Sequence, residues 1–227
     1  RTADADTLAA DLSDSAAPRA LWDAALGRAG GTIDVLVNNA GVFDANPIAR
    51  DDDEWLAKWE HDMAVNLTST AQLSRLAVRH WQARGCGGRI VHVASRAGHR
   101  GDSPEHWHYA AAKGGMLALH KTIARGYAGQ GILSFAVTPG FTDTAPKDSG
   151  AGDYLASRAG SGLLADIPLG RVATPEEIAY GRSLPKARIP DFPIRGYEYY
   201  DYRDDVVNTT FVNFQDNKLR KTGALSW

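Results

Sequence analysis

The stretch Ile33-Asp34-Val35-Leu36-Val37-Asn38-Asn39-Ala40-Gly41 passes from an apolar run directly into a short polar turn. Its first five residues are rich in β-branched side chains, as in a strand that a parallel sheet buries on both faces. Small residues after such a strand let a bound molecule approach the backbone at the carboxyl edge of the sheet. Taken alone, residues 38–41 are equally compatible with a simple polar turn.

On both sides of this stretch, helical and strand-like segments alternate, which predicts an α/β domain with a parallel sheet. A first helix is expected to start at Asp14 or Ser15, whose side chains can cap it, and to end at Gly30. Further helices are predicted over residues 51–84 and 104–127 and from Thr174 onward, and further strands over residues 89–93 and 132–138.

The composition is that of an ordinary soluble protein, with 44% hydrophobic residues, 23% charged residues and a formal net charge of −2. This charge gives no reason to expect nucleic acid or a membrane surface as a partner. No stretch approaches the ~20 apolar residues of a membrane span, and residues 1–6 lack the apolar centre of a secretion signal. The single cysteine, Cys86, cannot form an internal disulfide, which fits a cytoplasmic protein.

The composition changes after Gly181. Residues 182–227 contain only two alanines but eight of the chain's 20 aromatic residues, and their prolines prevent the preceding helix from continuing. Strands are predicted at 197–202 and 206–214. We therefore divide the chain into an α/β domain, residues 1–181, and an atypical Pro/Tyr-rich tail, residues 182–227. The hypothesis for this tail is an origin in another protein context, through gene fusion, frameshift or misassembly.

Two side chains of the helix predicted over residues 104–127 are suited to acid–base chemistry. Tyr109 and Lys113 are four residues apart, so they project from the same helix face. A nearby ammonium favours phenolate, so Lys113 is expected to lower the pKa of Tyr109 from about 10 toward neutrality. Tyr109 would then serve as a general acid and base. The alternative is a surface tyrosine beside a solvated lysine.

Ser95 and Asn66 are further candidates. Ser95 follows the strand at residues 89–93, where a hydroxyl can donate to a carbonyl oxygen that gains negative charge. Asn66 lies inside the helix predicted over residues 51–84, although asparagine is a poor helix former. Each residue alone also has an ordinary explanation, as a serine that ends a strand and a tolerated surface asparagine.

Read in order along the chain, these residues resemble the short-chain dehydrogenase/reductase family. The resemblance spans residues 7–181, and the strings around Ser95 and Tyr109 are most similar to the 3-oxoacyl-carrier-protein reductase type. It implies a Rossmann-like, doubly wound parallel sheet that lacks its first βαβ unit, followed by an irregular, β-rich tail. The residues that carry it are Asp11-Leu12, Asn38-Asn39-Ala40-Gly41, Asn66, Ser95, Tyr109-x-x-x-Lys113, and Pro139-Gly140 with Thr144.

The resemblance also implies catalytic roles. Tyr109 would exchange a proton with the substrate oxygen, which Ser95 would orient and polarise. Lys113 would hold the nicotinamide ribose, and Asn66 would hold a water that connects Lys113 to solvent. The implied cofactor is NADP or NAD, with NADP favoured. Its expected contacts are Asp11, at the adenine, with Leu12, Asn38, Ala40, Gly41, Tyr109, Lys113, Pro139, Gly140 and Thr144.

The resulting prediction is an NAD(P)-dependent oxidoreductase that interconverts a carbonyl and a secondary alcohol, acting as a homodimer or homotetramer. Residues 143–165 are expected to form a mobile lid over this small-molecule substrate. The 227 residues do not contain the family's Gly-rich phosphate-binding turn. The alternative is therefore a non-catalytic fragment or binding scaffold that cannot hold the cofactor. A Thr-Gly-x-x-x-Gly-x-Gly motif upstream would favour the enzyme.

Two other kinds of site are not expected. His99, His106 and His108 lack the regular spacing and the cysteine or acidic partners of a zinc site, so we predict no bound metal. Ser95 lacks the Gly-x-Ser-x-Gly motif that a serine hydrolase needs.

Overall fold

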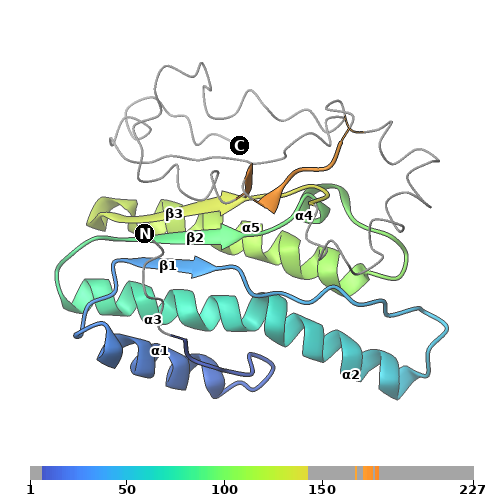
Figure 1. The fold of residues 1–227 in the computed structure, drawn as a ribbon, viewed down its shortest axis with the longest axis horizontal. Helices are drawn as coiled ribbons and strands as arrows, with labels where there is room; N and C mark the ends of the chain where they lie inside the picture. Colours follow the sequence, from blue (N-terminus) through green and yellow to red (C-terminus); the bar gives the residue numbers. More distant parts are fainter. Residues whose placement is uncertain (1–6, 143–166, 168–170, 176, 179–227) are drawn as a thin grey trace.

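The computed structural model describes residues 7–142, 167, 171–175 and 177–178 (Figure 1). The predicted lid, Thr144 within it and the tail at 182–227 lie outside the described residues. Within the described part, no helix combines the length and the apolar character that crossing a membrane requires.

Among the described residues, three parallel strands form a sheet, as the sequence predicts, and they lie in the order β1, β2, β3 (Figure 1). Their bounds are Val35–Asn38 for β1, Gly88–Val93 for β2 and Ile132–Val137 for β3. β1 begins two residues later than predicted. The carbonyl of Ile33 instead accepts a hydrogen bond from the indole Nε1 of Trp81, at 2.6 Å.

The helices follow the predicted order. The single helix predicted over residues 51–84 is an unbroken run of three helical segments, in which a π-helical turn, η1, joins two α-helices. α5 begins three residues later than predicted, after a connection that starts at Gly101, whose φ is +81°. The bounds are α1 Ala17–Arg28, α2 Asp52–Met63, η1 Ala64–Thr68, α3 Ser69–Ala83, α4 Ala97–Arg100, α5 Trp107–Tyr127 and the 3₁₀-helix η2 Ala128–Gln130.

Two predicted helix starts can be compared in detail with the structure. The predicted cap of α1 by Asp14 or Ser15 is wrong, because the N-cap residue is Ala16 and no side chain caps the helix; the Asp14 carboxylate accepts from the N–H of Ala16 at 2.9 Å, in the turn before the helix. At Thr174 the predicted cap is confirmed, since Thr174 Oγ1 accepts from the N–H of Glu177 (3.3 Å) and Glu177 Oε2 accepts from the N–H of Thr174 (2.8 Å). These two bonds form a capping box.

One face of the sheet packs against α3 and α5. Trp81 of α3 and Ile123 of α5 are buried against Ile90 and Ile132 of the sheet. A Cβ at Gly88 would lie 2.0 Å from the Trp81 ring, so only glycine fits at that position. Figure 1 shows α3 running along β1, with α1 on the outer side of α3.

The opposite face is covered by the segment around the Thr174 cap. Ala173 and Ile178 pack against Val91, Phe135 and Val137. Because the strands are parallel, their carboxyl ends, followed by Asn39, Ala94 and Thr138, meet at one edge of the sheet. A ligand site in an open parallel sheet is expected at that edge.

Candidate active site

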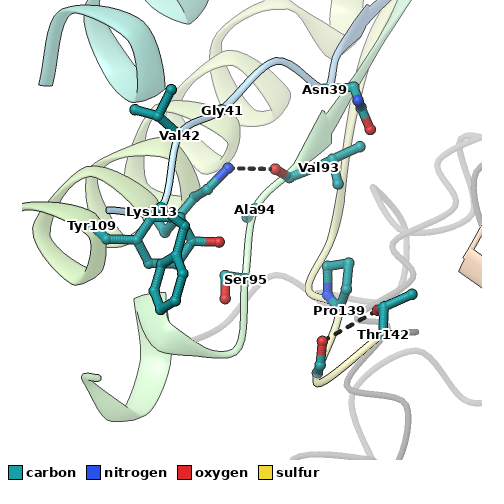
Figure 2. A pocket seen from close by; sticks show the side chains of 12 residues that line it. Asn39, Gly41, Val42, Val93, Ala94, Ser95, Tyr109, Lys113, Pro139 and Thr142 are labelled. Atoms are coloured by element: carbon teal, nitrogen blue, oxygen red, sulfur yellow. Dashed lines mark hydrogen bonds between the residues drawn. The ribbon is translucent and has the colours of Figure 1, made fainter. Parts of the chain in front are cut away.

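A cavity of about 240 Å³ opens at this edge of the sheet (Figure 2). It lies between the ends of the three strands and the first turns of α5. Six of the predicted site residues line it: Gly41, Ser95, Tyr109, Lys113, Pro139 and Gly140. The other lining residues are Asn39, Val42, Phe43, Val93, Ala94 and Thr142.

Tyr109, Ser95 and Lys113 enter the cavity from two elements (Figure 2). Tyr109 and Lys113 lie one turn apart in α5, and Ser95 lies two residues beyond the end of β2. The Ser95 hydroxyl accepts from the N–H of Ala97 at 3.1 Å and lies near enough to the Tyr109 phenol to act on its pKa. The three polar groups that the sequence singled out are therefore brought together.

The pKa of Tyr109 departs from the prediction. Burial of the phenol raises its pKa, the hydrogen bond with Ser95 acts in the opposite direction, and the charge of Asp102 raises it further. The Lys113 ammonium lies 5.5 Å from the centre of the Tyr109 ring and donates to the backbone carbonyl of Val93 at 2.9 Å. The expected lowering of the Tyr109 pKa is therefore wrong for this arrangement, because burial of the phenol raises the pKa and outweighs the lowering by Ser95.

Lys113 is itself perturbed. Its side chain is almost fully buried, and desolvation of the ammonium lowers its pKa to about 8. At neutral pH most of the population still carries the positive charge. A buried cation that can donate further hydrogen bonds is suited to holding ribose hydroxyls or another polar group in the cavity.

Asn66 is buried in the π-helical turn η1 and acts on the loop after β1. Its Oδ1 accepts from the N–H of Val42 and its Nδ2 donates to the C=O of Val42, both at 3.0 Å. Both ends of the side-chain amide thus bond to one backbone residue, and the water that the resemblance implies between Asn66 and Lys113 stays a prediction. A π-helical turn is an irregularity that recurs at functional sites, and here it presents Asn66 to the loop.

Gly41 lies where this loop passes closest to η1 and α5. A Cβ at this position would be 2.8 Å from Asn66 Oδ1 and 3.5 Å from Lys113 Nζ. Because two hydrogen bonds to Val42 hold the Asn66 amide, it cannot move aside without losing them. The absence of a Cβ at Gly41 therefore gives the Asn66 amide and the Lys113 ammonium the space that they occupy beside the loop.

Gly41→Ala should destabilise the fold by about 1–3 kcal/mol, because the added methyl group displaces Asn66 in a packed site. The matched control is Gly126→Ala in α5, where a Cβ meets nothing within 4 Å. That change should stabilise by up to about 1 kcal/mol, since alanine is the better helix former. Urea unfolding of both variants measures the difference. If Gly41→Ala is as stable as the parent, the loop tolerates displacement and the close approach has no structural consequence.

Other predicted cofactor residues lie outside the cavity lining. Asn38 is buried beneath it, where its Nδ2 donates to Ser74 Oγ at 3.1 Å, and Ala40 is exposed between two lining residues. Asp11 is exposed, and its carboxylate accepts from the N–H and the hydroxyl of Ser13. The adenine contact assigned to Asp11 and the cofactor contact assigned to Leu12 stay predictions.

Sequence reasoning missed two lining residues that shape the cavity. Thr142 donates to the carbonyl of Gly140 at 3.3 Å and lies at the rim (Figure 2). Phe43, 54% exposed, stacks on His106 with ring centres 4.0 Å apart and meets the Tyr109 ring edge-on at 4.7 Å. The sequence did carry a signal for Phe43, which lies only two residues after Gly41, a predicted cofactor contact.

Two of the three histidines considered for a metal are neighbours, since the rings of His106 and His108 lie 6.1 Å apart. His106 stacks on Phe43, His99 lies in α4, and His108 contacts a buried carboxylate of α2. In the described ranges, no group of three or more His, Cys, Asp or Glu side chains has an arrangement that could hold a metal ion.

Comparison with known proteins agrees with the family resemblance found in the sequence. The family described as enoyl-(acyl carrier protein) reductase matches residues 1–181, which end where the composition changes. The 3-oxoacyl-(acyl-carrier-protein) reductases FabG of Salmonella typhimurium and Escherichia coli are each 36% identical to this chain over 149 residues, or 66% of this chain and 57% of theirs. The FabG of Chlamydia muridarum is also 36% identical, over 66% of this chain and 56% of its own. The matched part thus spans a little over half the length of these relatives.

Proposed function

Because the chain belongs to the short-chain dehydrogenase/reductase family, we propose that the protein carrying it is an NAD(P)-dependent oxidoreductase that interconverts a carbonyl and a secondary alcohol. The observation that carries the proposal is the meeting of a phenol, a hydroxyl and an ammonium in one cavity, from Tyr109, Ser95 and Lys113. An acid, an oxygen-orienting donor and a buried cation are the groups that carbonyl reduction requires of the protein.

The donor set of the cavity fits the nicotinamide end of the cofactor. Lys113 would donate to the ribose hydroxyls, and glycine at position 41 lets the loop that lines the cavity pass close to Asn66 and Lys113. The bound cofactor would supply a hydride to the carbonyl carbon, or accept one from the alcohol carbon. NADP is favoured over NAD, as the sequence analysis proposed.

The protonation state of Tyr109 suits the direction of reduction. A raised pKa keeps the phenol protonated at neutral pH, so its proton is available to the carbonyl oxygen as that oxygen gains negative charge. Ser95 is placed to donate to the same oxygen. In the reverse reaction the phenolate would accept the proton of the alcohol, and the charge of Lys113 would support that anion once the side chain turned from Val93.

The names of the relatives suggest the substrate class. The FabG proteins are 3-oxoacyl-(acyl-carrier-protein) reductases, so a 3-oxoacyl thioester is the first substrate to test. As in the sequence analysis, we propose a homodimer or homotetramer as the working assembly.

The test is hydride transfer by the protein that carries this chain at its natural length. It is incubated with NADPH or NADH and a panel of carbonyls that includes a 3-oxoacyl thioester, and cofactor oxidation is followed by nicotinamide absorbance. We expect oxidation that depends on the carbonyl and is faster with NADPH. If no carbonyl stimulates oxidation of either cofactor, the oxidoreductase proposal fails and the binding scaffold becomes the better reading.

A further inference from the structure

A buried carboxylate lies next to the candidate active site and has no role in the proposed reaction so far. Asp62, near the end of α2, has a fully buried side chain. Its Oδ1 lies 2.6 Å from Lys58 Nζ and 2.9 Å from His61 Nδ1, and its Oδ2 lies 2.8 Å from His108 Nε2. Burying a carboxylate costs several kcal/mol unless its partners are well placed, so this arrangement demands an explanation.

His108 connects three segments of the chain at this point. It belongs to α5, it contacts Asp62 of α2, and its Nε2 lies 3.0 Å from the backbone carbonyl of Asp44. Because a carbonyl only accepts, Nε2 carries the proton and donates to it. Burial lowers the pKa of His108, against the charge of Asp62, so the neutral ring with a protonated Nε2 is the form present at neutral pH.

The residue after His108 is Tyr109, the proposed acid. Both lie in the first turn of α5, which begins at Trp107 without a side-chain cap. The first turn of an uncapped helix has unsatisfied N–H groups and tends to open locally. One backbone bond braces the chain just before it, from the N–H of Asn46 to the carbonyl of Glu105 at 2.8 Å. Within the described residues, His108 Nε2 and Asp62 Oδ2 make a close contact between this turn and α2: the carboxylate attracts the Nε2–H, although that N–H makes its hydrogen bond with the Asp44 carbonyl.

We propose that Asp62 and His108 are positioning residues of the reaction, which hold the first turn of α5 so that the Tyr109 phenol faces the Ser95 hydroxyl. The same link fixes Asp44, two residues beyond the Val42 backbone that Asn66 holds. Tyr109 and the loop that carries Val42 and Asp44 are thus both positioned relative to the buried Asp62 carboxylate. This inference rests on the proposed function. A misplacement of about 1 Å in a reacting group can cost about 100-fold in rate.

The test compares three variants of the natural-length protein. His108→Leu keeps a buried apolar side chain but removes the donor. His108→Gln keeps an N–H donor that can reach both Asp62 and the Asp44 carbonyl. The control is His120→Leu, which removes a buried histidine from the same helix, three turns away, where its Nδ1 lies 3.0 Å from Ser134 Oγ. For each variant, kcat, KM for the carbonyl, cofactor affinity and thermal stability are measured.

We expect His108→Leu to lower kcat by roughly 10- to 100-fold with KM and cofactor affinity within about three-fold of the parent. His108→Gln should restore most of kcat, and His120→Leu should lower stability but leave kcat within about three-fold. The proposal is overturned if His108→Leu retains kcat, or if His120→Leu loses as much kcat as His108→Leu does. Should His108→Leu not fold, His108→Asn, too short to reach Asp62, replaces it.

This design separates two failures. If the parent protein transfers no hydride, the proposed function itself is refuted. If the parent is active and the His108→Leu variant is equally active, only the positioning role is refuted. Amide hydrogen exchange at Ala110 and Ala111 adds a readout that does not need turnover: the exchange should be faster in His108→Leu and near the parent rate in His108→Gln.

Discussion

Tyr109→Phe should lower carbonyl reduction by on the order of 1,000-fold, while cofactor affinity stays within about three-fold of the parent. The substitution removes only the phenol oxygen, which the proposed reaction uses as its proton donor. The ring remains, with its edge-on contact to Phe43 at 4.7 Å, so the cavity wall keeps its shape. Ser95 retains its bond to the N–H of Ala97. Steady-state kinetics and a fluorescence titration of NADPH measure the two quantities.

The matched control is Tyr127→Phe at the far end of the same helix, where the ring packs against the core beneath α3. It should change turnover by less than about three-fold, since it does not line the cavity. Turnover in Tyr109→Phe within ten-fold of the parent would contradict the assignment of Tyr109 as the acid. Loss of cofactor binding along with turnover would instead identify Tyr109 as a binding residue.

The parts of the site that the sequence predicts are those set by local geometry. The four-residue spacing of Tyr109 and Lys113 places both side chains on one face of α5. A strand followed by Asn38 and small residues ends at the carboxyl edge of the sheet, and Ser95 follows the neighbouring strand. Since parallel strands end at a common edge, these local patterns are enough to bring the groups into one cavity.

The parts that the sequence did not predict depend on contacts between distant segments. Asn66 and Val42 are 24 residues apart, and nothing local to either shows that they bond through two hydrogen bonds. The pKa of Tyr109 was predicted in the wrong direction for the same reason. The spacing in α5 places Lys113 one turn from Tyr109, but the rise of the Tyr109 pKa comes first from burial of the phenol, which depends on residues that other segments pack around it.

A second large effect is expected below neutral pH, from two histidines inside the core. His92 of β2 and His120 of α5 are nearly fully buried, with ring centres 6.1 Å apart. Burial lowers the pKa of His92 to about 3, with further lowering by His120 and Lys113, and burial lowers the pKa of His120 to about 4, with further lowering by Lys121. The folded protein therefore keeps both rings neutral, while the unfolded chain takes up protons at a pKa of about 6.5.

The sign of the effect follows from this difference in proton uptake. The two histidines have lower pKa values in the folded protein than in the unfolded chain. Their contribution to the free energy of unfolding is therefore fully present above pH 6.5, and it is lost as the pH falls toward 4, because the unfolded chain then binds more protons. Each histidine contributes up to about 1.4 kcal/mol per pH unit in that window. Lowering the pH from 7 to 4.5 should therefore cost on the order of 4 kcal/mol through the pair, beyond any contribution from carboxylates.

Urea unfolding at several pH values, for the parent and for the double variant His92→Gln/His120→Gln, isolates this contribution. Glutamine is neutral at every pH used and can still bond to Asn38 and Ser134, the present neighbours of the two rings. The double variant should be less stable than the parent at pH 7 but should lose on the order of 4 kcal/mol less on acidification, with each single variant between them. If the free energy of unfolding falls equally with pH in the parent and the double variant, protonation of these two rings does not control the loss of stability in acid. The loss of stability would then have to come from carboxylates, whose paired, low-pKa forms act in the same direction but at lower pH.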